Sequence, residues 1–177
     1  MVDTQVALLR GINVGKAKRV AMSDLRTLVE GLGYRDVRTI LNSGNVVFKG
    51  SGEDASEAAR RIEDALLDRL SFPVKTLGIT AGELDEIVQS NPLVDQMTDP
   101  SRMAAAIYFD PEDRRRVLPL DLLPWAPEAF AAGRLAAYLW CPDGFTGSPL
   151  SAALGKALGD HATSRNWATL LRIQAIC

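Results

Sequence analysis

A basic loop near the start of the chain carries the side chains best suited to binding an anion. The loop spans residues 10–19 and holds four cationic side chains, while the whole segment 4–23 contains no Asp or Glu. Guanidinium and ammonium groups beside flexible glycine backbone bind phosphate and carboxylate groups. We therefore predict a site for a small anionic or phosphorylated ligand at this loop. Its candidate ligand-binding residues are Arg10, Asn13, Lys16 and Arg19.

The same loop resembles a phosphate-binding P-loop, but it lacks two features that such a loop requires. Residues 11–17 form a pattern one residue shorter than the P-loop, and Ala17 occupies the position of the magnesium-binding Ser or Thr. The next helix is also expected to begin several residues later. These differences exclude a nucleoside triphosphatase of the P-loop type. A solvated basic surface is the alternative explanation of the loop.

A predicted hairpin supplies a second set of polar side chains. Two β-prone segments, residues 36–41 and 45–49, flank the turn sequence Asn42-Ser43-Gly44. Amide and hydroxyl groups at the tip are suited to hydrogen bonding a polar ligand. The same residue types are common in hairpin turns, so a purely structural role is equally well supported. The candidate ligand-binding residues at the tip are Asn42, Ser43 and Asn45.

The first half of the chain predicts the element order β-α-β-β-α-β, which matches the ferredoxin-like arrangement. Helices are expected after an N-cap at Ser23 and after a capping box at residues 54–57, because apolar residues then recur at helical spacing. A further capping box at residues 80–83 begins a short third helix. The four expected strands span residues 4–9, 36–41, 45–49 and 74–79.

The second half predicts β-α-β-β-α-α, a degenerate echo of the first half. Here Thr163 or Ser164 is expected to cap a last helix, which stands where a fourth strand would be. The predicted class is α+β. We expect a ferredoxin-like subdomain, a helical connector, and a second α+β subdomain packed on the first, over residues 1–80, 81–101 and 102–177 respectively.

The predicted topology brings the basic loop and the hairpin tip together. A right-handed crossover makes the first two strands of such a unit parallel, with the third strand between them and antiparallel to both. The loop that follows the first strand and the tip of the hairpin must then emerge at the same edge of the sheet. We therefore expect one site formed by the loop 10–19 and the tip 42–45.

Several motifs resemble a known family. The segments 8–15 (LLRGINVG), 43–48 (SGNVVF) and 162–167 (ATSRNW) are similar, in this order, to the family called domain of unknown function 1697, or DUF1697. The resemblance implies an α+β fold with ferredoxin-like character and a cytoplasmic bacterial setting. It implies no reaction, cofactor or catalytic residue.

The resemblance also draws attention to Arg165 and Asn166. Both are expected in the first turn of the last helix, where free N–H groups and the helix dipole favour an anion. If this helix lies beside the basic loop, the two residues complete one site built from both ends of the chain. Trp167, which follows them, is more simply explained as a core anchor.

Composition excludes several classes of protein. The 177 residues are 47% hydrophobic and carry a net charge of −2, which is unlike a protein whose whole surface binds polyanions. The single histidine, His161, and the two cysteines lack the spacing of metal ligands, so no metal and no cofactor are expected. No apolar run approaches the roughly 20 residues that a membrane span needs, so a cytoplasmic protein without membrane contact is expected.

Three functions agree with these features. The first is a binding or enzymatic domain for a small anionic ligand at the loop 10–19 and the tip 42–45. The second, ranked lower, is an RNA-binding module, for which Phe48 is the obvious stacking aromatic in the first sheet. The third is a non-catalytic interaction or assembly protein. The sequence assigns no catalytic residue and no oligomeric state.

Overall fold

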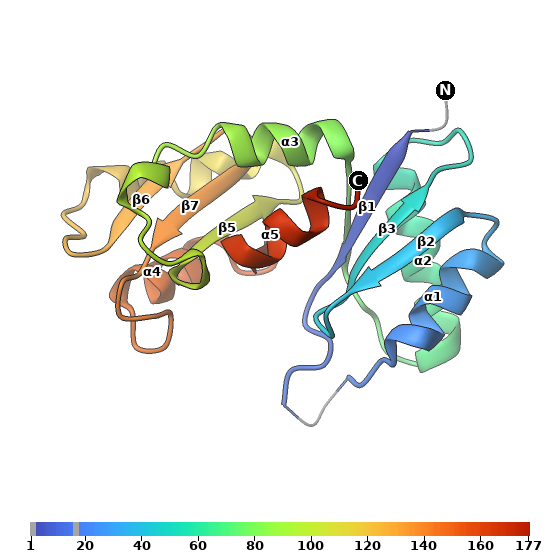
Figure 1. Ribbon diagram of the computed structural model, residues 1–177. Coiled ribbons are helices and arrows are strands. Elements are labelled where there is room, and N and C mark those ends of the chain that lie inside the picture. Colours follow the sequence, from blue (N-terminus) through green and yellow to red (C-terminus); the bar gives the residue numbers. More distant parts are fainter. Residues whose placement is uncertain (1–2, 16–17) are drawn as a thin grey trace. The chain divides into compact units, whose positions relative to one another are not determined.

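The computed structural model describes residues 3–15 and 18–177, which form two compact units. Unit 1 comprises Met1–Leu84 together with Arg172–Cys177, and unit 2 comprises Asp85–Leu171. Each unit combines helices with a four-stranded antiparallel sheet (Figure 1), so the protein belongs to the α+β class, as the sequence predicts. No helix in the described part of the chain is long and apolar enough to cross a membrane.

Unit 1 contains one sheet in the order β2-β3-β1-β4. Strand β3 is antiparallel to both β1 and β2, which therefore run parallel to each other on either side of it. The end of β1 and the turn between β2 and β3 consequently lie at the same edge. The elements are β1 (Thr4–Leu9), α1 (Met22–Gly31), β2 (Arg35–Ile40), β3 (Asn45–Lys49), α2 (Ala55–Leu70), β4 (Thr76–Thr80) and α3 (Ala81–Gln89), the last of which continues into unit 2.

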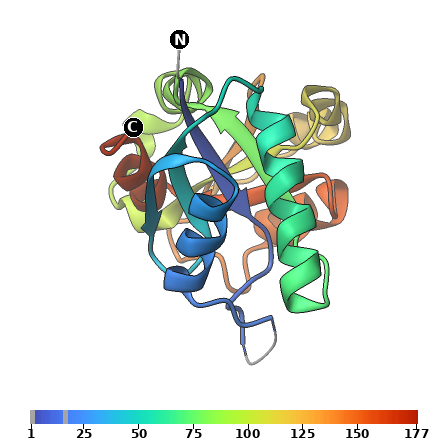
Figure 2. The ribbon, with the colours of Figure 1, turned by 90° about the vertical axis from the view of Figure 1, so that its right-hand side faces the viewer.

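The core of unit 1 lies between the sheet and two helices. Helices α1 and α2 cover one face of the sheet (Figure 2). Alternate strand residues point into this layer, among them Leu9, Val46 and Phe48, and meet Leu25 of α1 and Ile62 of α2. All five side chains are at most 2% exposed. Burial of each contributes about 1.5–3 kcal/mol, which fixes the register of the strands against the helices.

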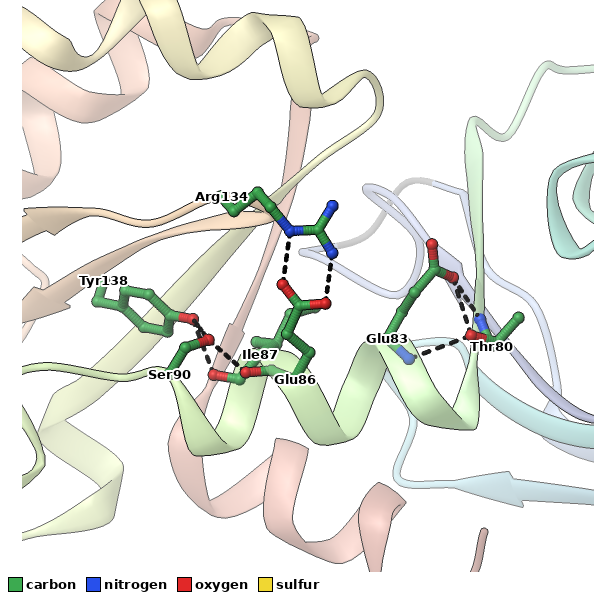
Figure 3. A network of polar contacts seen from close by, with 7 residues as sticks. All are labelled: Thr80, Glu83, Glu86, Ile87, Ser90, Arg134 and Tyr138. Carbon is green, nitrogen blue, oxygen red and sulfur yellow. Dashed lines mark hydrogen bonds and ion pairs between the residues drawn. The ribbon is translucent and has the colours of Figure 1, made fainter.

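Helix starts in the first half of the chain follow the expected caps in two of three cases. The Asp54 side chain accepts a hydrogen bond from the Glu57 N–H (2.8 Å) at the start of α2. At α3, Thr80 and Glu83 form a reciprocal capping box, in which the Glu83 N–H donates to Thr80 Oγ1 (3.1 Å) and the Thr80 N–H to Glu83 Oε2 (2.8 Å; Figure 3).

The predicted N-cap at Ser23 is wrong. Helix α1 begins two residues earlier, at Met22, and its N-cap residue is Ala21, which forms no side-chain capping bond. Ser23 lies in the first turn, where its carbonyl accepts a hydrogen bond from Thr27 Oγ1 (3.0 Å). Val20, which precedes the N-cap residue Ala21, donates its N–H to the side chain of Asn13 in the basic loop. This contact, rather than a local cap, sets the start of the helix.

Unit 2 contains a second sheet, in the order β6-β7-β5-β8. One face packs on α4 and on two short 3-10 helices that take the place of α1. The elements are the 3-10 helices η1 (Val94–Gln96) and η2 (Pro100–Arg102), β5 (Met103–Tyr108), the 3-10 helices η3 (Pro111–Arg116) and η4 (Leu118–Leu122), β6 (Ala129–Ala132), β7 (Ala136–Trp140), α4 (Pro149–Leu158), β8 (Ala162–Asn166) and α5 (Trp167–Gln174).

The helix predicted after Thr163 or Ser164 is wrong, because residues 162–166 form strand β8. This strand pairs antiparallel with β5, and the ladder supplies the backbone hydrogen bonds that a helix would have supplied. Helix α5 begins only at Trp167, where the Thr169 N–H donates to Asn166 Oδ1 (2.8 Å). Local capping signals favoured a helix, and pairing with a distant strand prevailed.

The sheet of unit 2 therefore repeats the strand order and register of the sheet of unit 1. In each sheet the first strand pairs with the third and the fourth in the same register: Thr4 faces Lys49 as Met103 faces Trp140, and Leu9 faces Thr76 as Tyr108 faces Ala162. In each unit the last residue of the fourth strand, Thr80 or Asn166, caps the helix that follows it directly.

Candidate functional site

The side chain of Asn13 holds the basic loop closed. Its Nδ2 donates to the Val20 carbonyl oxygen (2.8 Å), and its Oδ1 accepts from the Val20 N–H (2.9 Å). Asn13 has a φ of +55°, a left-handed conformation that Asn tolerates better than most residues. Both ends of the segment 13–20 are thus fixed by one amide side chain.

Asn13 also joins the loop to the hairpin tip. Its Nδ2 donates a second hydrogen bond, to the Asn42 carbonyl oxygen (2.7 Å). The tip packs closely on the loop at Gly44, where an added Cβ would lie 2.7 Å from Leu9 Cβ and from Ile12 Cδ1. The loop and the tip therefore meet, as the topology predicts, but Asn13 positions them and its amide is already used.

Asn45 has a structural role as well. It is fully buried, and its Nδ2 donates to the Ile40 carbonyl oxygen (2.8 Å) and to Ser43 Oγ (2.9 Å). These bonds close the turn between β2 and β3. Of the three tip residues that the sequence suggests as ligands, Asn42 and Ser43 are exposed, while Asn45 supports the turn from inside.

A shallow groove of about 320 Å³ opens where the loop, the tip and α1 meet. The side chains of Arg19 and Asn42 are exposed beside it. The N-terminus of α1 lies in its wall, and no side chain of the described residues caps that helix. The first N–H groups of a helix lack intrahelical partners and carry the positive end of its dipole. The groove is lined by Asn13, Arg19, Val20, Ala21, Met22 and Asn42.

The other cations of the loop lie elsewhere. Arg10 directly follows β1, is half-buried, and donates its backbone N–H to the Lys75 carbonyl oxygen (2.8 Å). The Lys18 ammonium lies 5.9 Å from the centre of the Phe72 ring, close enough for a cation–π contact. Lys16 lies outside the described residues. Arg19 is the described cation that lines the groove.

Arg165 and Asn166 belong to unit 2, and both have structural partners there. Arg165 lies on strand β8 and is only 8% exposed, with Nη1 donating to Thr163 Oγ1 (3.0 Å) and to the Ser164 carbonyl oxygen (2.9 Å). Burial lowers the pKa of its guanidinium to about 10. Asn166 caps α5. The prediction that both residues lie in the first turn of the last helix is wrong, because the helix begins after them.

Comparison with known proteins identifies the family. A family described as "Protein of unknown function (DUF1697)" matches residues 2–138. The chain belongs to the DUF1697 family. This confirms the resemblance carried by the motifs at 8–15 and 43–48. The solved structure of the conserved bacterial protein SP0830 from Streptococcus pneumoniae has a TM-score of 0.81 and 22% sequence identity, covering 99% of each chain, which shows a shared fold. None of the curated proteins matches.

This DUF1697 protein also contains a polar network that sequence reasoning missed. Glu53 accepts hydrogen bonds from Ser51 Oγ (2.5 Å), from the Tyr34 hydroxyl (2.5 Å) and from Arg61 Nη1 (2.7 Å). The bonds from Ser51 and Tyr34 lower the pKa of the Glu53 carboxyl to about 2. Arg61 also donates to the Leu32 carbonyl oxygen (2.9 Å), so the network ties the end of α1 to α2. The sequence predicted only the helix cap at the neighbouring residue Asp54 and did not indicate the contacts of Glu53.

Unit 2 of this DUF1697 protein has its own charge clusters. Asp113 accepts from Arg116 Nε (2.7 Å) and lies 3.1 Å from His161 Nδ1. Burial opposes ionisation of Asp113, but these two bonds prevail and lower the pKa of its carboxyl. Arg134 binds both carboxylate oxygens of Glu86, with Nε 2.6 Å from Oε1 (Figure 3). Among the described residues, no group of three or more His, Cys, Asp or Glu side chains is arranged to hold a metal ion.

Proposed function

We propose that this DUF1697 protein binds a small anionic or phosphorylated ligand in the groove between the loop, the hairpin tip and α1. The observation that carries the proposal is the N-terminus of α1, which opens into the groove beside the exposed guanidinium of Arg19 and has no side-chain cap from the residues that the structure describes. Free backbone N–H groups, the helix dipole and a guanidinium together bind phosphate oxygens.

The groove supports binding more than acid–base catalysis. Among its described lining residues, Arg19 is the one ionisable side chain, and no carboxylate, imidazole or thiol is available to transfer a proton near neutral pH. Asn42 offers its side-chain amide, because its contact with Asn13 uses only the backbone carbonyl. We therefore assign Arg19, Asn42 and the first N–H groups of α1 as ligand-binding groups, with Asn13 and Asn45 as positioning residues.

The RNA-binding alternative loses its main feature. Phe48, the aromatic suggested for base stacking, is 2% exposed and lies 4.6 Å from the ring of Tyr34 on the face that the helices cover. A buried ring offers no stacking platform. RNA bound only through its phosphates to the exposed loop would lose affinity steeply as the salt concentration rises. The salt dependence of binding therefore distinguishes RNA binding from binding of a small anion.

The experiment is a thermal-melting screen of the intact protein against inorganic phosphate, nucleoside monophosphates and sugar phosphates. A ligand at about 100 times its Kd stabilises the folded state by roughly 2.7 kcal/mol and raises Tm. We expect a shift for the wild type, a much smaller one for Arg19→Gln, and an unchanged one for Arg60→Gln, which removes an exposed charge from α2 instead. No shift for any of these anions, or equal shifts in both variants, would contradict the proposal.

A further inference from the structure

A second groove lies in unit 1, at the opposite end of β1 from the basic loop. Its volume is about 330 Å³. Small-molecule sites have volumes from about 300 Å³ upward. The end of the chain forms one wall and lies beside β1 (Figure 1), where Thr4 Oγ1 is 3.5 Å from the Cys177 carbonyl oxygen. The other walls are formed by Thr4, Asp36, Arg38, Val47 and Lys49.

The strand register places these side chains on one face of the sheet. Arg38 pairs with Val47, and Thr4 pairs with Lys49. Because partners across a ladder and residues two apart on a strand share a face, these four side chains project together. Their neighbour Phe48 points to the other face, into the core beneath α1 and α2. The groove therefore lies on the face that these helices do not cover.

A β-bulge shapes the wall formed by β2. The register shifts between Arg35, which pairs with Lys49, and Arg38, which pairs with Val47, so β2 contains one extra residue. Within the bulge Asp36 has a φ of +53°, an uncommon conformation for a residue other than glycine. Bulges redirect side chains and are frequent beside functional sites, and strained residues gather there too. Both Asp36, inside the bulge, and Arg38, directly after it, line the groove.

The groove carries charges of both signs that lack counterions within the described part of the chain. Neither Arg38 nor Lys49 forms an ion pair with a carboxylate of the described residues, and Asp36 forms none with a cation of those residues. Lys49 Nζ instead donates to Thr4 Oγ1 (2.6 Å). Two cations, a carboxylate and the apolar Val47 all line the groove, so it can complement a ligand that carries both charges and an apolar part.

We propose that this groove binds a small zwitterion, an α-amino acid with an apolar side chain. The planar guanidinium of Arg38 receives the carboxylate, since its fork geometry suits two parallel hydrogen bonds. Lys49 adds a second positive charge, and Asp36 receives the ammonium group. Val47 and Ile176 line the part of the groove left for the apolar side chain. This site is separate from the anion site at the basic loop, so either can exist without the other.

The test is an NMR titration of the intact ¹⁵N-labelled protein with L-leucine, L-valine and L-phenylalanine. Two truncated probes, 3-methylbutylamine and 4-methylpentanoate, lack the carboxylate and the ammonium of leucine respectively. We expect at least one amino acid to shift the amides of Arg38 and Lys49, and both truncated forms of leucine to bind at least tenfold more weakly than leucine. Absence of shifts at about 10 mM, roughly tenfold above a Kd of 1 mM, would overturn the proposal.

Matched variants locate the site. Arg38→Gln should weaken binding at least tenfold, whereas Arg60→Gln, which removes an exposed cation from α2 outside the groove, should leave it within twofold. Asp36→Asn keeps a residue type that tolerates left-handed backbone and should remove the preference for leucine over 4-methylpentanoate. If Arg38→Gln loses the dispersed spectrum of the folded protein, Lys49→Gln replaces it. Unchanged affinity in these variants, shifts confined to other residues, or equally tight binding of inorganic phosphate would refute the zwitterion site.

Discussion

Replacing Asn13 by Ala should destabilise the loop that frames the proposed anion site. The substitution removes three hydrogen bonds, two from Nδ2 and one to Oδ1. Each contributes about 0.5–1.5 kcal/mol net, and the exposed bond to the Asn42 carbonyl belongs at the low end. Alanine at a φ of +55° adds about 1 kcal/mol of backbone strain. We expect a total loss of about 3 kcal/mol.

Asn13→Gly separates the two causes. Glycine loses the same three hydrogen bonds but adopts the left-handed backbone without strain, so it should be more stable than the Ala variant by about 1 kcal/mol. Urea denaturation of the intact protein measures the difference between the two variants. Amide hydrogen exchange then locates the effect, which should appear at residues 18–21 and 41–45 and leave the strands of unit 2 protected.

The outcome that refutes this account of the loop is specific. If Asn13→Ala lowers the free energy of unfolding by less than about 0.5 kcal/mol, as ordinary surface substitutions do, the hydrogen bonds of Asn13 do not hold the loop. Equal stability of the Ala and Gly variants would show that the left-handed conformation carries no strain. Faster exchange in unit 2 alone would place the effect in the wrong unit.

Three further outcomes are expected. Glu53→Gln should lower the free energy of unfolding by about 1.5–3 kcal/mol, as loss of hydrogen bonds to a charged group does. In the wild type this stabilisation is complete above the ordinary Glu pKa of 4.5 and is lost as pH falls toward about 2. The urea midpoint of the wild type should therefore fall over that pH window, and the midpoint of the variant should fall less. Leu41→Asn should raise stability by about 1 kcal/mol, because Leu41 is exposed with a φ of +55°, and an unchanged melting curve would contradict this. Thr80→Ala and Asn166→Ala should cost similar amounts, about 1 kcal/mol each, because they remove equivalent caps in the two repeats; a neutral effect of either breaks the equivalence.

Local signals predicted much of unit 1 from the sequence. The bounds of β1 and β3 were fixed by short apolar or β-branched runs between turn residues, and the Asp54 cap marked the start of α2. The meeting of the loop with the hairpin tip followed from the handedness of the crossover, which needs no knowledge of side chains.

The remaining features depend on contacts that no short segment encodes. Residues 162–166 carry cap-like side chains, and only pairing with β5 makes them a strand. Asn13 and Asn45 were expected to contact a ligand because polar types in a loop suggest binding, yet their amides bind backbone carbonyls and, for Asn45, also the Ser43 hydroxyl. The contact of Glu53 with Tyr34 likewise joins residues that are far apart in the sequence.

One measurement tests the central claim most directly, an NMR titration of the ¹⁵N-labelled protein with inorganic phosphate at low and high salt. A phosphate bound at the start of α1 should shift the amides of Ala21, Met22 and Ser23 together with that of Asn42, in a saturable way, and Arg19→Gln should weaken the binding. Small, non-saturating shifts, or saturable shifts confined to other surfaces, would contradict an anion site at this edge of the sheet.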